Sequence, residues 1–225
     1  MNRILLILSV FIATCIMFYP TNSKSNASGS PGGKTGSIGD NQESCSNCHY
    51  AGVGNGASIT SNIPTSGYIP GETYTITATV EEAGRSKFGF EVTSEDNTGN
   101  KKGSFLATNS TETNTIINST AITHKAGGTN GTNIKSWEFD WVAPGFASST
   151  GSVIFYGSFL GANGDGQNTG DTYHSDQLEV FESTNTPNNI KENEELNSIL
   201  ITNNKIHVNK NINSLNVYDI SGKLI

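Results

Sequence analysis

The chain has 225 residues and a formal net charge of −7 at pH 7, because 20 Asp and Glu outnumber 13 Lys and Arg. The sequence has no basic patch, which argues against nucleic acid as a partner and against docking to anionic lipid. Its length suits one modest domain with tails, and its many Gly, Ser, Thr and Asn residues are typical of secreted β proteins.

The N-terminal residues have the pattern of a secretory signal peptide. Arg3 gives a short positive start, residues 4–19 are almost continuously apolar, and Ser25-Asn26-Ala27 offers small residues at the positions that a signal peptidase reads. We predict that residues 1–27 are removed, so that the mature chain has no transmembrane segment. A retained N-terminal anchor and a lipoprotein modified at Cys15 are the alternatives. All three readings place the protein outside the cytoplasm.

Residues 28–60 form the next predicted unit, a Gly-rich lead-in followed by a haem-binding segment. Residues 28–40 have no apolar period, so we expect a flexible stretch that packs, if at all, beside the cofactor. Gly52, Gly54 and Gly56 are expected to end this unit.

The haem-binding segment is the CxxCH motif Cys45-Ser46-Asn47-Cys48-His49. Two thiols three positions apart can each add across a vinyl group of one haem, and the adjacent histidine is then held beneath the iron as an axial ligand. Cys15 lies in the leader, so both cysteines of the mature chain belong to this motif. We predict one covalently attached haem c per chain, bound through Cys45, Cys48 and His49.

Three other roles for the cysteine pair stay open. The two residues could form a tight disulfide, with His49 a bystander. A redox dithiol normally opens a helix after a strand in an alternating α/β pattern, which this sequence lacks. A structural zinc ion needs about four protein ligands, and the sequence has no second CxxC or HxxxH motif.

The second axial ligand has to be a histidine or an open site, because both methionines lie in the leader. We predict His49 and His124 as the metal ligands, since His124 follows an expected strand and precedes a Gly-rich loop. His174 is the second choice, and it sits within a strand pattern. His207 lies in a tail that would be removed, and a water-filled position is the remaining alternative.

Beyond the motif, short alternating segments dominate residues 61–182. Residues 73–81 alternate apolar residues with threonine, the period of a half-buried strand. Turns are expected at residues 68–71 and 143–145. We predict an all-β, antiparallel β-sandwich. Its other expected strands are residues 88–92, 103–108, 115–122, 137–141, 153–159 and 173–181.

A polar stretch before the last of these strands resembles an oxygen-ligand calcium loop. It contains Asn163, Asp165, Gln167 and Asp171, but the Gly and terminal Glu of an EF-hand are missing. A Gly/Asn/Asp turn explains the stretch equally well, so calcium and a simple turn both stay open. The sequence shows no Ser-His-Asp order, paired-carboxylate motif or phosphate loop, and we predict that the protein is not an enzyme.

The C-terminal part divides into a polar linker, residues 183–196, and a small β unit, residues 197–225. Apolar residues near positions 199–201, 206–208 and 215–219 mark three short strands in this unit.

Two family resemblances are visible in these motifs. The Gly-rich lead-in, CxxCH, the Tyr-x-Pro-Gly turn, Trp137-x-x-x-Trp141-x-Ala143-Pro144, and Phe155-Tyr156 followed by Ala162-Asn163-Gly164-Asp165-Gly166 resemble the bacterial choice-of-anchor V domain, a relative of the reelin-type (reeler) β-sandwich. This match covers roughly residues 30–182. Members of that family often carry CxxCH near the start, so the resemblance implies both the sandwich and the haem.

Residues 215–223 look like the C-terminal sorting domain of type IX secretion in Bacteroidota. The resemblance implies export through the outer membrane by the type IX machinery, followed by removal of the tail. The sequence departs from the family pattern at Ile225, before the expected Gly-x-Tyr strand and Lys-containing end, so we expect a partial sorting domain.

Together these features predict a secreted or cell-surface protein, associated with the outer membrane and reached through the periplasm. We expect a monohaem protein that transfers electrons to or from a redox partner protein. The alternative is a surface adhesion or carbohydrate-contacting β-sandwich in which Cys45 and Cys48 form only a structural pair.

Overall fold

The computed structural model describes residues 25–145 and 151–184, together with residues 7, 11, 12, 14, 199–202, 205–208 and 223. The chain divides into two compact units, Met1–Thr184 and Asn185–Ile225. Most of the predicted signal peptide, and most of the predicted linker, lie outside the described residues. In the part of the chain that is described, no helix has both the length and the apolar character needed to cross a membrane.

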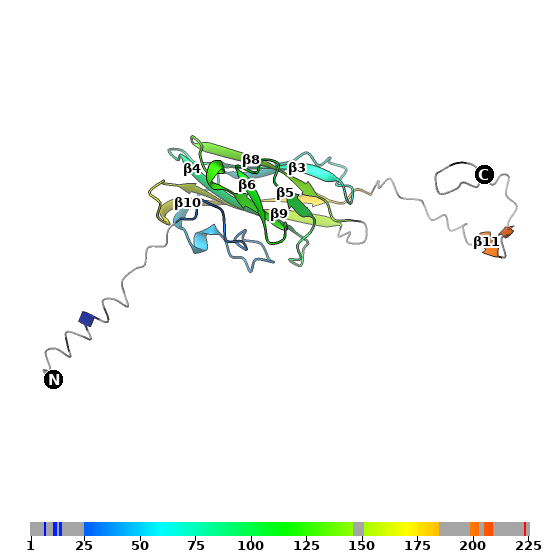
Figure 1. The fold of residues 1–225 in the computed structure, drawn as a ribbon, viewed down its shortest axis with the longest axis horizontal. Helices are drawn as coiled ribbons and strands as arrows, with labels where there is room; N and C mark the ends of the chain where they lie inside the picture. The colour runs from blue at the N-terminus through cyan, green and yellow to red at the C-terminus, as the bar shows by residue number, and fades with distance from the viewer. Residues whose placement is uncertain are drawn as a thin grey trace. The chain divides into compact units, whose positions relative to one another are not determined.

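The first unit is built from two sheets packed face to face (Figure 1). The six-stranded sheet has the order β1 (Tyr50–Val53), β10 (Thr169–Phe181), β9 (Ser152–Ala162), β4 (Lys87–Glu95), β7 (Ala121–His124) and β6 (Thr113–Ile116). The four-stranded sheet has the order β2 (Ala57–Ser61), β3 (Thr73–Glu81), β8 (Ile134–Val142) and β5 (Ser104–Leu106). Two short 3₁₀ turns, η1 (Cys45–Asn47) and η2 (Ala126–Gly128), complete this unit. The predicted all-β sandwich is confirmed.

The alternation of apolar residues explains why these segments form strands. Strand β3 has the predicted bounds, and its apolar side chains Ile76, Ala78 and Val80 are buried while the threonines between them lie on the outer face. Strand β3 pairs with β8 so that Ile76 lies opposite Phe139 and Ala78 opposite Trp137. Each pair buries its side chains on the same face, which fixes the register of the two strands.

Aromatic rings fill the space between the sheets. The ring of Phe90, from β4, lies 4.4 Å from that of Trp137 and 5.8 Å from that of Phe139. Trp141 meets Phe155 edge-on at 5.0 Å. Both indole N–H groups have acceptors, because Trp137 donates to Gly128 O at 2.8 Å and Trp141 to Ser94 Oγ at 3.0 Å. A buried tryptophan needs such a partner, so these two contacts help to fix the core.

Residues 115–122 form two strands, and the prediction of one strand there was wrong. Ile117, Asn118 and Ser119 have φ values of 51°, 53° and 65°. Three consecutive left-handed residues cannot continue an extended strand. They turn the chain between β6 and β7, which pair antiparallel with Thr115 opposite Ile122.

Strands β1 and β2 were not predicted. Gly52 lies inside β1, where a glycine cluster was expected to end the haem unit. Strand β1 runs parallel to β10, with Gly52 opposite Thr172 and Val53 opposite Tyr173. A parallel partner so far along the chain leaves no hairpin signal in the sequence.

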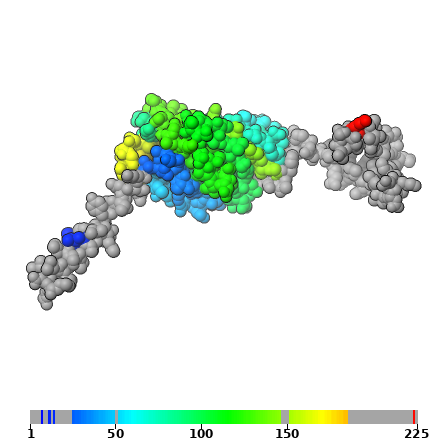
Figure 2. Space-filling model, viewed as in Figure 1, coloured from blue at the N-terminus to red at the C-terminus, as the bar shows by residue number. Residues whose placement is uncertain are grey.

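The Gly-rich lead-in is ordered, and the prediction of a flexible segment was wrong. It covers the outer face of β4, so that this strand is buried on both faces. The N–H of Lys34 donates to Glu91 Oε1 at 3.3 Å, and the hydroxyl of Ser30 also donates to the Glu91 carboxylate. Further on, Ser37 Oγ donates to Glu95 Oε1 at 2.5 Å. Figure 2 shows these N-terminal atoms, in blue, lying against the green atoms of the middle of the chain.

The second unit contains one described hairpin. Strands β11 (Ile199–Thr202) and β12 (Lys205–Val208) pair antiparallel, with Leu200 opposite His207 and Ile201 opposite Ile206. Two of the three strands expected in the tail are therefore present. The third, at residues 215–219, lies outside the described residues, so the partial sorting domain stays a prediction.

The contrast between a buried and an exposed phenylalanine gives a stability prediction. Phe90 is 1% exposed at the centre of the aromatic core, whereas Phe181 is 61% exposed at the end of β10. We expect Phe90→Ala to lower the free energy of unfolding by about 3–5 kcal/mol, because it leaves a cavity. Phe181→Ala is the matched control, with an expected change of about 0.5 kcal/mol or less. Equal losses in urea unfolding followed by tryptophan fluorescence would contradict this core.

Candidate functional site

The CxxCH motif forms a tight turn at the start of the sandwich. Cys45–Asn47 is the 3₁₀ turn η1, capped by Ser44, whose side chain accepts from the N–H of Ser46. The N–H groups of Cys48 and His49 both point to Cys45 O, at 3.2 and 2.9 Å. In a 3₁₀ turn, side chains three residues apart lie on the same side. The turn therefore directs both cysteines toward the same cavity, which is described below.

Neighbouring strands hold this turn through its backbone. The N–H of Cys45 donates to Ser158 Oγ in β9 at 3.0 Å, and Asn168 Nδ2 donates to Cys48 O at 2.6 Å. Cys45 is buried, Cys48 is exposed, and both are free thiols. Burial raises the pKa of the Cys45 thiol to about 12, against the opposing effect of the Ser158 hydroxyl.

A cavity of about 380 Å³ opens beside the motif. Its volume falls in the range of about 300–1,000 Å³ that is common for small-molecule sites. The cavity brings together all four residues that the sequence predicted for the cofactor: Cys45, Cys48, His49 and His124. Its wall also includes the apolar residues Leu160 and Ala162, and two lysines, Lys34 and Lys87.

The imidazole of His49 is held by a buried carboxylate. Its Nδ1 atom lies 2.5 Å from Asp171 Oδ2 in β10. The other oxygen of Asp171 accepts from the N–H of Asn163 at 3.0 Å. When Nδ1–H donates to the carboxylate, Nε2 carries the lone pair and is the nitrogen that can bind a metal.

His124 lies at the end of β7 and is 8% exposed. Its Nδ1 atom is 3.0 Å from the N atom and 3.2 Å from the O atom of Phe90, and its Nε2 atom is 3.4 Å from Asn26 O. Gly89 leaves room for the ring, because a Cβ there would lie 2.8 Å from His124 Cε1.

The charge state of His124 follows from its burial. Burial lowers the pKa of His124, and contacts with Phe90 and Asn26 oppose this effect. The imidazole is therefore neutral at pH 7, the form that binds metals.

The other histidines lie elsewhere. His174, in β10, is buried, but it does not line the cavity. Its Nδ1 accepts from the N–H of Gly56 at 3.0 Å, and its Nε2 lies 3.2 Å from Glu82 Oε2. His207 lies in β12 of the second unit. Of the three candidates for the second ligand, His124 is the one that lines the cavity beside His49.

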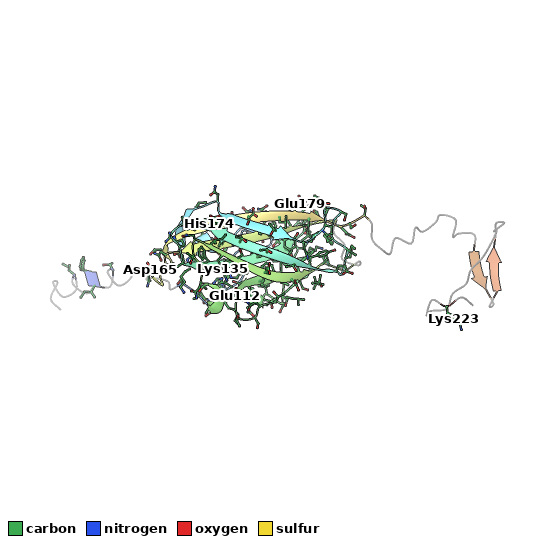
Figure 3. All side chains as sticks on the ribbon, turned by 90° about the horizontal axis from the view of Figure 1, so that it is seen from above. Glu112, Lys135, Asp165, His174, Glu179 and Lys223 are labelled. Atoms are coloured by element: carbon green, nitrogen blue, oxygen red, sulfur yellow. The ribbon has the colours of Figure 1, made fainter. Side chains whose placement is uncertain are left out.

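The calcium-like stretch folds as a polar turn between β9 and β10. Asn163 Oδ1 accepts from the N–H of Asp165 at 3.1 Å, and Asp165 Oδ1 accepts from the N–H of Gln167 at 2.7 Å. Asp165 lies near one end of the sandwich, with His174 and Glu179 further along β10 (Figure 3). Among the described residues, no group of three or more His, Cys, Asp or Glu side chains could hold a metal ion. Turn chemistry accounts for this stretch.

Sequence reasoning missed the residues that support the motif. Ser158, Asn168 and Asp171 follow it by more than a hundred positions, and strand pairing alone brings them close. Asp171 was singled out only as a member of the calcium-like pattern. The sequence carries no local signal that joins it to His49.

Comparisons with known proteins concern the fold. No family model matches the chain, and no curated protein matches it. Among solved structures, the human F-spondin reeler domain is similar, with 17% identity and a TM-score of 0.45 over 59% of this chain and 94% of that chain. The Reelin-N domain of F-spondin has 20% identity and a TM-score of 0.42 over 59% and 91% of the two chains. AvmM, which catalyses macrocyclization in alchivemycin A biosynthesis, has 12% identity and a TM-score of 0.37 over 58% and 90%.

The different settings of the two thiols give a labelling prediction. With a pKa of about 12, a fraction on the order of 10⁻⁴ of Cys45 is thiolate at pH 8. In leaderless chain made without haem, iodoacetamide should therefore modify the exposed Cys48 at least about 100-fold faster than the buried Cys45. Peptide mass spectrometry measures both rates, and in urea they should become equal. Equal rates in the folded chain would contradict the burial of Cys45.

Proposed function

We propose that this protein is an exported c-type monohaem protein that transfers electrons. The observation that carries the proposal is the single cavity lined by Cys45, Cys48, His49 and His124. These residues come from the CxxCH turn and from β7, far apart in the sequence. Both thiols, one imidazole with its Nδ1 engaged and one buried neutral imidazole therefore face the same space.

The wall of the cavity suits a porphyrin. A haem is an apolar ring that carries two carboxylates. Leu160 and Ala162 offer apolar contacts to the ring, and Lys34 and Lys87 offer positive charge to the carboxylates. Bound haem would supply one-electron chemistry, with iron alternating between Fe(II) and Fe(III).

Each residue at the cavity would have a separate role in holding the haem. The thiols of Cys45 and Cys48 would form the two thioether bonds, and the Nε2 lone pair of His49 would bind the iron. His124 would supply the second imidazole for the iron once its Nε2 is released from Asn26 O, 3.4 Å away. Asn26 lies in the predicted leader, so cleavage after Ala27 would remove that acceptor. The iron could then gain or lose an electron without either imidazole gaining or losing a proton.

A surface-binding role in adhesion is the second candidate. Strands β2 and β10 border a second hollow of about 360 Å³, lined in part by Ile59, Ile63 and Leu178, and the exposed Phe181 lies on it. A hollow with an exposed aromatic residue offers an apolar contact to another surface molecule. In this role the CxxCH cavity would hold no haem, so haem content separates the two proposals.

Covalent attachment is the first test. Chain expressed with its leader and a c-type haem maturation system should keep its haem on a denaturing gel, because two thioether bonds hold it. The double variant Cys45→Ala, Cys48→Ala should lose all haem staining, whereas His174→Ala, outside the cavity, should keep it. A wild-type chain without staining, or without a pyridine haemochrome spectrum, would refute the electron-transfer proposal.

Ligation of the iron is a separate prediction. We expect low-spin ferric iron with two imidazoles, and no methionine charge-transfer band, since Met1 and Met17 both lie in the predicted leader. His124→Ala should give high-spin iron that binds carbon monoxide readily. His174→Ala is the matched control, because it also removes a buried strand histidine, and its spectrum should equal that of the wild type. The reverse result would assign the ligand to His174.

A further inference from the structure

Asp171 is a buried carboxylate whose two oxygens have different partners. It lies in β10 and is 2% exposed. Its Oδ2 atom is 2.5 Å from His49 Nδ1, and its Oδ1 atom accepts from the N–H of Asn163 at 3.0 Å. A carboxylate so far removed from water needs strong partners for its charge. The structure supplies one from the turn before β10 and one from the CxxCH motif.

The position of His49 is fixed independently of this contact. Its N–H points to Cys45 O at 2.9 Å, and the preceding carbonyl, of Cys48, accepts from Asn168 Nδ2 at 2.6 Å. The backbone is thus held in place on both sides of the residue. The backbone does not fix the rotation of the His49 ring or which of its nitrogens carries the proton. The contact with Asp171 fixes both.

We propose that Asp171 is a positioning residue that keeps the proton on His49 Nδ1 and makes Nε2 a stronger donor to iron. The proposal rests on the haem function proposed above. A carboxylate accepts a hydrogen bond more strongly than a neutral carbonyl does, and low polarity around the pair strengthens the bond further. Such a partner raises the electron density that a histidine offers to its metal.

The consequence is a preference for the ferric state. More electron density from Nε2 stabilises Fe(III) relative to Fe(II), so the reduction potential falls. The buried aspartate therefore suits this chain to donate electrons to a partner of higher potential. A purely structural role for Asp171 would alter folding stability and leave the iron unchanged.

The test compares two aspartate-to-asparagine substitutions in the haem-loaded protein, one in β10 and one in the turn before it. Asp171→Asn keeps the size of the side chain and an acceptor for the N–H of Asn163, but removes the negative charge beside His49. Asp165→Asn is the matched control, since Asp165 is exposed and its hydrogen bonds go to Asn163 and Gln167. In redox titrations, Asp171→Asn should shift the potential upward, while Asp165→Asn should leave it at the wild-type value.

A second readout reports on the iron–histidine bond itself. In the His124→Ala background, where ferrous iron would be five-coordinate, Asp171→Asn should lower the Fe–His49 stretching frequency in resonance Raman spectra. If Asp171→Asn fails to fold, wild-type protein still decides the matter. Its ferric NMR spectrum should show a slowly exchanging Nδ1 proton on His49.

The outcomes separate this proposal from the one on which it rests. Wild-type chain without covalent haem would overturn both. Attached haem with the same potential in Asp171→Asn and wild type, or with no slowly exchanging Nδ1 proton, would overturn only the role of Asp171. An upward shift confined to Asp171→Asn, with a weaker Fe–His49 bond, would support it.

Discussion

The site depends on two carboxylates buried on the outer face of β4. Glu91 and Glu95 point away from the aromatic core, and both are fully buried. A buried carboxylate without partners is costly. The Gly-rich lead-in supplies partners for both: Glu95 accepts from the N–H of Gly39 at 2.9 Å, and Glu91 accepts from Ser30 and Lys34. Lys101, outside the lead-in, also donates its Nζ to Glu95 at 2.7 Å. Burial raises the pKa of Glu91, and the hydrogen bonds from Ser30 and Lys34 oppose that rise. The lead-in is thereby tied across the sheet, and the CxxCH turn at its end comes to rest beside β9.

This arrangement lets the six-stranded sheet support the predicted cofactor residues of the cavity. Strands β10, β9, β4 and β7 are consecutive in the six-stranded sheet. They contribute Asp171 behind His49, Ser158 beneath Cys45, Gly89 in the wall and His124 at the edge. A site carried by paired strands keeps its geometry better than one carried by loops. The chain thus combines a short loop motif, which brings the two thiols, with a sheet that determines where the histidines point.

How much the sequence could predict varies with the range of the interactions involved. Strand β3 and the core residues of β8 were predictable because alternation is a local property, and Cys45, Cys48 and His49 because a motif is local too. His124 was predicted from its position before a Gly-rich loop, and the structure places it on the same cavity. The single strand expected over residues 115–122 failed because nothing in the composition marks Ile117 as left-handed. The role of Asp171 and the ordered structure of the lead-in could not be predicted from the sequence. Each depends on a partner residue that only the folded sheet brings close.

The path of the lead-in also links export to the cavity. Gly29, at φ 129°, passes so close to β7 that a Cβ would lie 2.8 Å from His124 O and 3.1 Å from Thr123 Cγ2. Only a residue without a side chain fits this approach comfortably. It brings Ser25, Asn26 and Ala27, the last residues of the predicted leader, onto the wall of the cavity, where Asn26 O faces His124 Nε2. While these residues remain, they occupy space and an imidazole nitrogen that a cofactor would use. Cleavage after Ala27 would free both without moving the sheet, since the contacts that tie the lead-in to Glu91 begin at Ser30.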